Sequence, residues 1–115
     1  MTGGEAVVET LIANDVELVT GLIGSSTLEI LDGLYNNADK VRYIGCRHES
    51  NGMIMMDAYA RYTGKNGVFL SGQAGPGVSN TVTAMAQAKA AFSPVVNLAG
   101  AIAVSYTHLT LPTKA

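Results

Sequence analysis

The sequence has no tryptophan, a single cysteine (Cys46) and few charged residues, which make up 14% of its 115 positions. One cysteine excludes an internal disulfide and fits a reducing compartment. The net charge of −2 gives no reason to expect nucleic acid or an anionic membrane as a partner. No apolar run approaches the ~20 residues that span a bilayer, and the first residues do not have the pattern of a signal peptide. These absences predict a cytoplasmic protein.

Acidic residues are missing from the second half of the chain, since all nine lie at or before Asp57. The segment Gly75-Pro76-Gly77-Val78-Ser79-Asn80 resembles the start of a G-x-G-x-x-G motif, with Asn80 at the third glycine. A dinucleotide site also needs a carboxylate about 20 residues further on, so the missing acids argue against it. Neither glycine-rich loop ends like a P-loop. Two interpretations remain open: a loop that approaches a flat or anionic ligand, and a turn that eases helix–sheet contact.

Hydrophobic residues make up 48% of the sequence, which is typical of one small globular domain. Helix-period segments and short apolar segments alternate along the chain. The expected strands are 16–22, 41–44, 68–71 and 95–99, and the expected helices are 2–14, 27–35, 50–62 and 78–91. Thr2 and Glu5 have the spacing of a capping box at the first helix. This alternation predicts an α/β fold, a parallel sheet with helices on both faces.

Three loops follow strands and therefore share one edge of the predicted sheet: 21–26, 46–50 and 72–77. In open α/β sheets, ligands bind at this edge. Glu49 lies there, before the helix 50–62, whose many apolar residues predict burial around much of its circumference. A simpler interpretation of Glu49 is that its charge favours the positive N-terminus of that helix.

Other polar residues near this edge have structural explanations. Cys46, His48 and Glu49 are close in sequence, but a structural zinc requires four ligands, and we expect no metal site. A nucleophile pair of Cys46 and His48 is disfavoured, because side chains two residues apart in an extended segment need not touch. Asp57 and Arg61 form an i,i+4 pair with an expected contribution of about 0.2–0.5 kcal/mol.

Several motifs occur together in a recognisable order. They are Arg47-His48-Glu49 before a helix ending Asp57-Ala-Tyr-Ala-Arg61-Tyr-Thr-Gly64, then Gly75-Pro76-Gly77-x-x-Asn80, and then Ser93-Pro94-Val95-Val96 before Gly100. In order and spacing they resemble the N-terminal pyrimidine-binding domain of thiamine-diphosphate-dependent enzymes of the acetolactate synthase, pyruvate oxidase and decarboxylase family. The resemblance covers residues 1 to about 103. Within the family, the loops around Gly24 and Gly75 look most like those of sulfoacetaldehyde acetyltransferase.

The resemblance implies a role for Glu49 and a set of cofactor contacts. Family members place their catalytic glutamate at this position, where it bonds N1′ of the aminopyrimidine of thiamine diphosphate and helps to remove the proton from C2 of the thiazolium. The implied cofactor-binding residues come from the three predicted loops: Gly24, Ser25, Ser26, Glu49, Gly75, Pro76, Gly77 and Asn80. The reaction would form or cleave a C–C bond next to a carbonyl, with a 2-keto acid or sulfoacetaldehyde as the substrate.

The resemblance also implies partners. Mg2+ and the diphosphate would be held by a second, diphosphate-binding domain that this sequence lacks, in a homodimer or homotetramer. We therefore expect a truncated pyrimidine-binding domain at 1–103 that is inactive alone. Residues 104–115 resemble translated sequencing-adapter read-through, and we interpret them as a non-native tail. The alternative functions are a stand-alone binding or regulatory domain without chemistry of its own, and a nucleotide-binding module.

Overall fold

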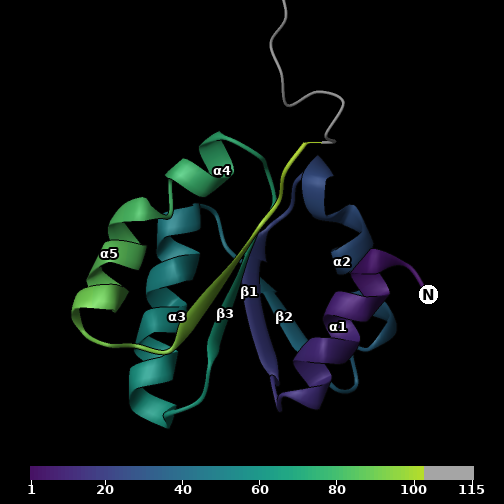
Figure 1. Cartoon of the computed structure of the whole chain (residues 1–115), viewed down its shortest axis with the longest axis horizontal. Helices are drawn as coiled ribbons and strands as arrows, with labels where there is room; N and C mark the ends of the chain where they lie inside the picture. Colours follow the sequence, from purple (N-terminus) through teal and green to yellow (C-terminus); the bar gives the residue numbers. More distant parts are fainter. Residues whose placement is uncertain (103–115) are drawn as a thin grey trace, which may run out of the picture.

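The computed structural model describes residues 1–102, in which helices and strands alternate (Figure 1). In chain order the elements are α1 (Gly3–Ala13), β1 (Leu18–Leu22), the 3₁₀ turn η1 (Ser25–Thr27), α2 (Leu28–Asn36), β2 (Arg42–Gly45), α3 (Glu49–Thr63), β3 (Gly67–Ser71), α4 (Pro76–Ser79), α5 (Val82–Ala90) and β4 (Val95–Ala99). The predicted tail 104–115 lies outside the described residues. Within residues 1–102, no helix combines the length and the apolar character needed to cross a membrane.

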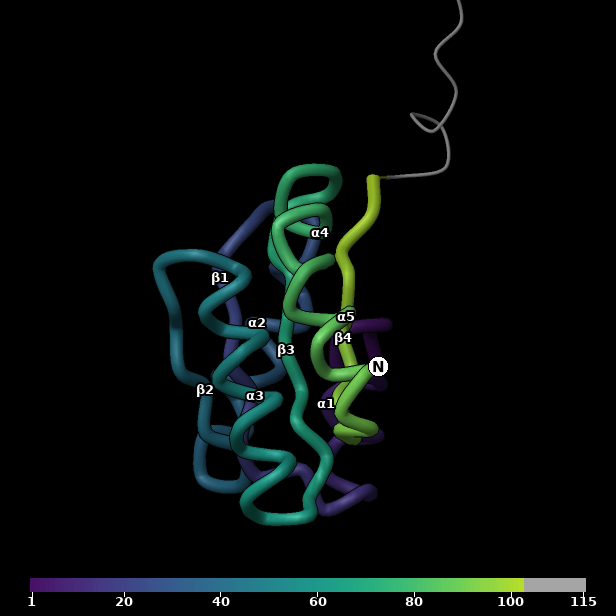
Figure 2. The backbone as a smooth tube through the Cα atoms, turned by 90° about the vertical axis from the view of Figure 1, so that its left-hand side faces the viewer, coloured from purple at the N-terminus to yellow at the C-terminus, as the bar shows by residue number. Residues whose placement is uncertain are grey.

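The four strands form one sheet in the order β2-β1-β3-β4, and all its neighbouring strands are parallel, which confirms the predicted parallel sheet. Helices α1 and α2 cover one face and helices α3 and α5 cover the other, so β1 and β3 lie between two helical layers (Figures 1 and 2). Every residue of β3 is buried. Because the strands are parallel, all four end at the same edge of the sheet, and α4 lies at that edge.

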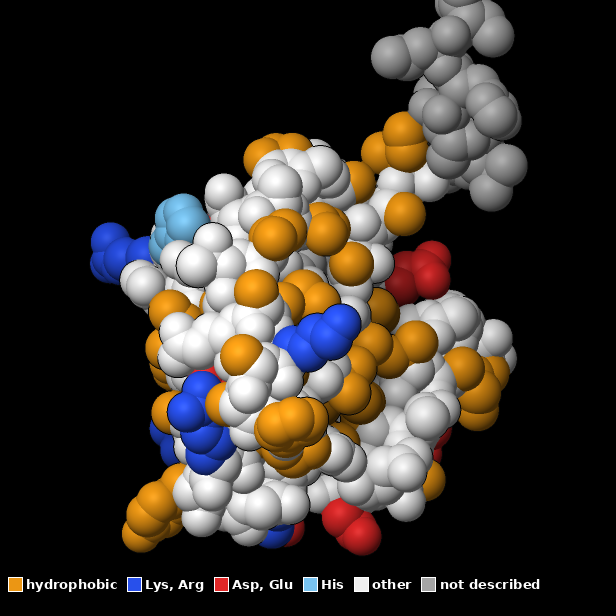
Figure 3. All heavy atoms as spheres, turned by 60° about the vertical axis from the view of Figure 1, so that its left-hand side comes forward, with side chains coloured by type: hydrophobic (Ala, Val, Ile, Leu, Met, Phe, Trp, Pro, Cys, Tyr) orange, Lys and Arg blue, Asp and Glu red, His pale blue; other side chains and the backbone are white. Residues whose placement is uncertain are grey.

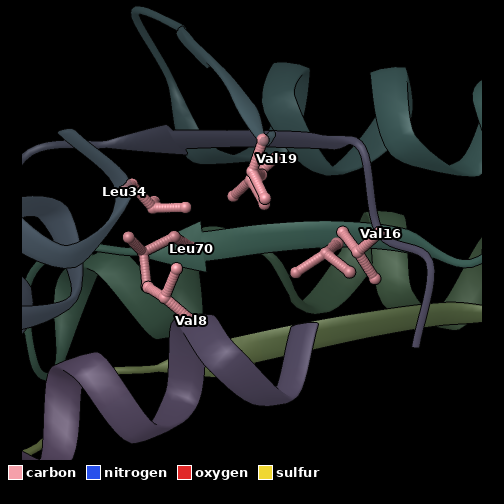
Figure 4. Close-up of a cluster of buried hydrophobic side chains, with 7 residues drawn as sticks. Val8, Val16, Val19, Leu34 and Leu70 are labelled. Atoms are coloured by element: carbon pink, nitrogen blue, oxygen red, sulfur yellow. The ribbon is translucent and has the colours of Figure 1, made fainter. Parts of the chain in front are cut away.

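Two hydrophobic clusters hold the layers together, one on each face of the sheet. The first contains side chains from α1, α2, strands β1 and β3 and the segments just before β1 and β2, which point toward one another (Figure 4): Val8, Val16, Val19, Leu34, Val41, Val68 and Leu70. The second joins α3 and α5 to β3 through Met53, Met56, Phe69 and Ala84. Burial of one such side chain contributes about 1.5–3 kcal/mol, so these clusters stabilise the fold far more than any single surface pair.

Helix ends follow local sequence signals. Thr2 and Glu5 form the predicted capping box: the Thr2 N–H donates to Oε2 of Glu5 at 2.8 Å, and the Glu5 N–H donates to Oγ1 of Thr2 at 3.1 Å. At the end of α3, Gly64 adopts a φ of 73° and its N–H donates to the Ala60 carbonyl. Glycine adopts this left-handed conformation without strain, so the helix ends there.

The expected helix 78–91 is wrong, because the structure divides it into α4 and α5. Thr81 is fully buried between them, and its hydroxyl donates to the Val78 carbonyl at 2.6 Å and accepts from Nδ2 of Asn97 in β4 at 3.0 Å. Helix α5 begins anew where the Met85 N–H donates to the Thr81 carbonyl. Helical periodicity does not reveal the break, because the contact with Asn97 spans 16 residues.

The expected burial of α3 around much of its circumference is also wrong. Met53 and Met56 face the sheet and are at most 1% exposed, whereas Ile54 and Met55 are 44% and 41% exposed. Helix α3 therefore covers the sheet with one face and presents apolar side chains on the other.

Asp57 makes more contacts than the expected pair with Arg61. The residue is 3% exposed, and its carboxylate accepts two hydrogen bonds from Arg61, at 2.9 and 2.6 Å. The Ser93 hydroxyl also donates to it, as does Nε2 of Gln87 at 3.5 Å. These bonds, above all those from Arg61, lower the pKa of Asp57 below its usual value. We therefore expect a contribution above about 0.2–0.5 kcal/mol, because the carboxylate joins α3, α5 and the turn before β4.

Candidate functional site

The loops that follow β1 and β3 are in direct backbone contact at the C-terminal edge of the sheet. A Cβ added at Gly24 would be 2.0 Å from the carbonyl oxygen of Gly72. The Ser26 N–H donates to the same oxygen at 3.3 Å, and the Ser25 hydroxyl donates to Oε1 of Gln73 at 3.2 Å. The sequence folds this way because glycine has no side chain to separate the two backbones.

Glu49 is the first residue of α3, and its neighbours explain why the helix starts there. His48 precedes it in an extended conformation, and Nδ1 of His48 accepts a hydrogen bond from the Ser50 N–H at 3.2 Å. This bond satisfies one of the free N–H groups of the first helical turn. Glu49 itself is only 6% exposed, and the positive end of the helix stabilises its negative charge.

Two groups on the loop after β3 lie against the Glu49 carboxylate. Nδ2 of Asn80 donates to Oε2 at 3.0 Å. A Cβ at Gly77 would be 3.6 Å from Oε1, and no donor among residues 1–102 bonds that oxygen. The carboxylate therefore has one oxygen held by an amide and the other free, next to a backbone without a side chain.

The turn that brings these groups to Glu49 depends on glycine and proline. Gly75 adopts a φ of 79°, in the region that favours glycine. Pro76 follows at the start of α4, where a helix does not need its missing N–H. Gly77 is buried, and a Cβ there would be 3.2 Å from the Cβ of Gln73. A single helical turn can therefore pass close to the carboxylate.

The structure divides the predicted site residues into two sets. The set next to Glu49, or in the turn that approaches it, is Gly75, Pro76, Gly77 and Asn80. The other set, Gly24, Ser25 and Ser26, is joined to Gly72 and Gln73. Sequence reasoning missed His48 as a helix cap, although its place before Glu49 at the helix start was a signal, and it missed Gln73 because only the fold brings Gln73 to Ser25.

Cys46 and His48 bond different partners. Sγ of Cys46 donates to the Gly21 carbonyl oxygen at 3.1 Å, and burial, the largest cause, raises the pKa of this thiol. A raised pKa disfavours the reactive thiolate. Nδ1 of His48 contacts the Ser50 hydroxyl instead, at 2.7 Å. In the part of the chain that the structure describes, no group of three or more His, Cys, Asp or Glu side chains is placed to hold a metal ion.

Comparison with known proteins gives one family. Residues 1–114 match the family described as "Thiamine pyrophosphate enzyme, N-terminal TPP binding domain". Over 96 residues, 84% of the chain, the sequence is 45% identical to 15% of the sulfoacetaldehyde acetyltransferase of Alcaligenes xylosoxydans xylosoxydans. Over 100 residues, 87% of the chain, it is 40% identical to 17% of the catabolic acetolactate synthase of Raoultella terrigena. Over 101 residues, 88% of the chain, it is 42% identical to 15% of the 2-hydroxyacyl-CoA lyase 2 of Xenopus laevis.

These matches confirm the resemblance inferred from the sequence motifs. The matched part of the chain spans only 15–17% of the length of these three relatives. The fold agrees with the match, because the described residues form the expected parallel α/β sheet. The chain therefore belongs to the thiamine pyrophosphate enzyme family and carries its N-terminal TPP binding domain.

Proposed function

We propose that this domain is part of a thiamine-diphosphate-dependent enzyme that forms or cleaves a C–C bond next to a carbonyl group, with a 2-keto acid or sulfoacetaldehyde as the substrate. Its relatives are an acetyltransferase, a synthase and a lyase, which supports this broad reaction class. The observation that carries the proposal is the Glu49 carboxylate, which lies buried at the C-terminal edge of the sheet with Oε2 bonded to Asn80 and Oε1 free.

The residues around Glu49 suit the aminopyrimidine end of the cofactor. A free carboxylate oxygen can share a proton with a ring nitrogen such as N1′, and the missing side chain at Gly77 leaves room beside Oε1 for a planar ring. The same residues do not suit Mg2+, because residues 1–102 hold no cluster of metal-ligand side chains, and the diphosphate would be held together with that ion. We assign both of these groups to a second domain of the same enzyme.

The proposed mechanism gives each loop a task. When bound, the cofactor supplies a nucleophilic carbon at C2 of its thiazolium ring, which attacks a carbonyl group. Glu49 acts as the general acid–base group that holds a proton at Oε1 and exchanges it with N1′. The backbone of Gly75, Pro76 and Gly77 would hold the pyrimidine ring, and the loop of Gly24, Ser25 and Ser26 would contribute to the site for the thiazolium and substrate of the neighbouring subunit.

A homodimer or homotetramer is part of the same proposal. Figure 3 shows hydrophobic side chains gathered over α3 and α5. The exposed apolar residues of these two helices include Ile54, Met55, Val82 and Met85. Exposed apolar residues in such numbers mark interaction sites, and two of these residues, Ile54 and Met55, belong to α3, the helix that begins at Glu49. A second subunit on this surface would cover these residues.

The test is Glu49→Gln in the full-length enzyme, followed by hydrogen–deuterium exchange at C2 of the bound cofactor and by turnover. Glutamine keeps the size and a hydrogen bond but does not exchange the proton, so we expect a modest loss of cofactor affinity and an exchange about 10²–10⁴-fold slower. Glu9→Gln is the matched control, because Glu9 is exposed on α1, and it should leave both measurements unchanged. Exchange at the parent rate in Glu49→Gln would show that Glu49 is only a helix-end residue.

The chain itself distinguishes this proposal from a stand-alone binding domain. Because residues 1–102 hold no ligand cluster for the Mg2+ that would bind with the diphosphate, we expect no measurable binding of thiamine diphosphate at micromolar concentrations. Calorimetry of the chain with cofactor and Mg2+ measures this directly. Tight, Mg2+-dependent binding would contradict the assignment of those groups to another domain.

A further inference from the structure

Asn80 is placed by the turn that precedes it. The Asn80 N–H closes α4 by donating to the Pro76 carbonyl at 3.0 Å. The side chain then reaches from the end of α4 to Glu49, 31 residues earlier in the sequence, and donates to Oε2 at 3.0 Å. The backbone bond fixes where α4 ends and does not require an amide side chain, so the contact with Glu49 needs a separate explanation.

We propose that Asn80 is a positioning residue: by holding Oε2 of Glu49, it presents Oε1 to the ring nitrogen of the aminopyrimidine. This inference rests on the proposed function, and it replaces the cofactor contact expected for Asn80 with a contact to the carboxylate. Three observations carry it. Nδ2 bonds one oxygen only, no donor among residues 1–102 bonds the other, and the free oxygen lies beside the bare backbone of Gly77. One bonded oxygen also limits rotation of the carboxylate, which would otherwise exchange the two oxygens.

The chemistry of an amide suits this task. An amide N–H donates a charge-assisted hydrogen bond to a carboxylate, which is stronger than a bond between neutral groups. An amide also has no proton to lose near neutral pH, so it does not compete with Glu49 for the proton that is exchanged. An aspartate at this position would place two carboxylates side by side, and a histidine or lysine would add a second ionisable proton.

The hydrogen bond is tested by exchanging its donor and acceptor in the chain without cofactor. Asn80→Asp brings a second carboxylate to Glu49 and should lower the folding equilibrium constant about tenfold or more. Adding Glu49→Gln provides an amide donor for the new carboxylate and should restore most of this loss. The effect of the double change on the folding equilibrium constant should therefore differ about tenfold from the product of the two single effects. A double effect within about twofold of that product would overturn the proposal.

Asn51→Asp is the matched control for this exchange. Asn51 is exposed in the first turn of α3, two residues from Glu49, and residues two apart on a helix do not face each other. The effects of Asn51→Asp and Glu49→Gln on the folding equilibrium constant should therefore be independent. If Asn80→Asp does not fold, a folded double variant with Glu49→Gln supports the bond. Failure of that double variant, while Asn80→Ala folds, overturns it.

Positioning of the reacting oxygen is tested in the full-length enzyme with Asn80→Ala. Exchange at C2 of the bound cofactor should slow about tenfold or more, because small displacements of a reacting group are costly. The dissociation constant of the cofactor should change less than about threefold. A parallel rise in that constant would show a cofactor contact, and an unchanged exchange rate would show no effect on Glu49; either result overturns the proposal. The proposed function fails only if Glu49→Gln also exchanges at the parent rate.

Discussion

Replacing Asp57 with asparagine should lower the free energy of unfolding by about 2 kcal/mol, several times the 0.2–0.5 kcal/mol of an isolated i,i+4 pair. The carboxylate accepts two short bonds from Arg61 and one from Ser93. A hydrogen bond to a charged group contributes about 1.5–3 kcal/mol. The contributions of the individual bonds do not add, because the Arg61 side chain is 45% exposed and water screens its charge. Asparagine keeps one acceptor oxygen, but its amide N–H groups would replace the other oxygen and face the N–H groups of Arg61, which are also donors.

Urea unfolding followed by circular dichroism measures this loss, provided that the slope of the transition is the same for both chains. Asp39→Asn is the control, because Asp39 is exposed in the turn before β2 and should change the free energy of unfolding by less than about 0.5 kcal/mol. A loss below about 0.5 kcal/mol for Asp57→Asn would refute the reasoning, because the carboxylate would then contribute no more than a surface pair.

The same carboxylate makes stability depend on pH. The bonds from Arg61, and then those from Ser93 and Gln87, lower the pKa of Asp57 below its usual value of 3.8, so folding favours the ionised form. Its contribution is fully present above about pH 4–5, where the aspartate of the unfolded chain is ionised, and is lost as the pH falls through the folded value. The difference in stability between the parent and Asp57→Asn should therefore shrink below about pH 4. A difference that grows on acidification would contradict this.

Four further predictions concern single features of the fold. Tyr43→Phe should leave the free energy of urea unfolding unchanged or raise it, because the buried hydroxyl has no hydrogen-bond partner within residues 1–102; a clear loss would reveal a missing partner. His48→Ala should lower the free energy of unfolding, measured by thermal unfolding, by about 1 kcal/mol through loss of the α3 cap, whereas His48→Asn should retain most of this stability. Gly24→Ala should fold poorly, since its Cβ would be 2.0 Å from the Gly72 carbonyl oxygen, and a normal melting temperature would show that the two loops can separate. Deletion of residues 104–115 should change the free energy of unfolding by less than about 0.5 kcal/mol if they are foreign, and a loss of several kcal/mol would show native packing.

The fold could be predicted because its signals are local. Short apolar strands between amphipathic helices indicate a parallel sheet, and the capping box of Thr2 and Glu5 marks the start of α1. The parallel order then places the loops after β1, β2 and β3 at one edge. The position of Glu49 at that edge follows from the order of the elements alone, whereas a catalytic role for it came only from the family resemblance.

The parts that could not be predicted depend on contacts between distant residues. The break between α4 and α5 needs Thr81 to meet Asn97, and the network at Asp57 needs Ser93, 36 residues later. The bond from Asn80 to Glu49 likewise spans 31 residues. Each of these contacts joins segments that only the packed fold brings together, so no local pattern of residues encodes it.

The backbone contact between Gly24 and Gly72 restricts how this edge of the sheet can be re-engineered. Neither position carries a side chain that could be trimmed to make room for a different partner. A loop grafted from a relative after β1 would therefore have to be grafted together with its counterpart after β3. In a chimeric gene, the crossover points belong before β1 and after α4, so that both loops come from the same parent and their close backbone contact is kept.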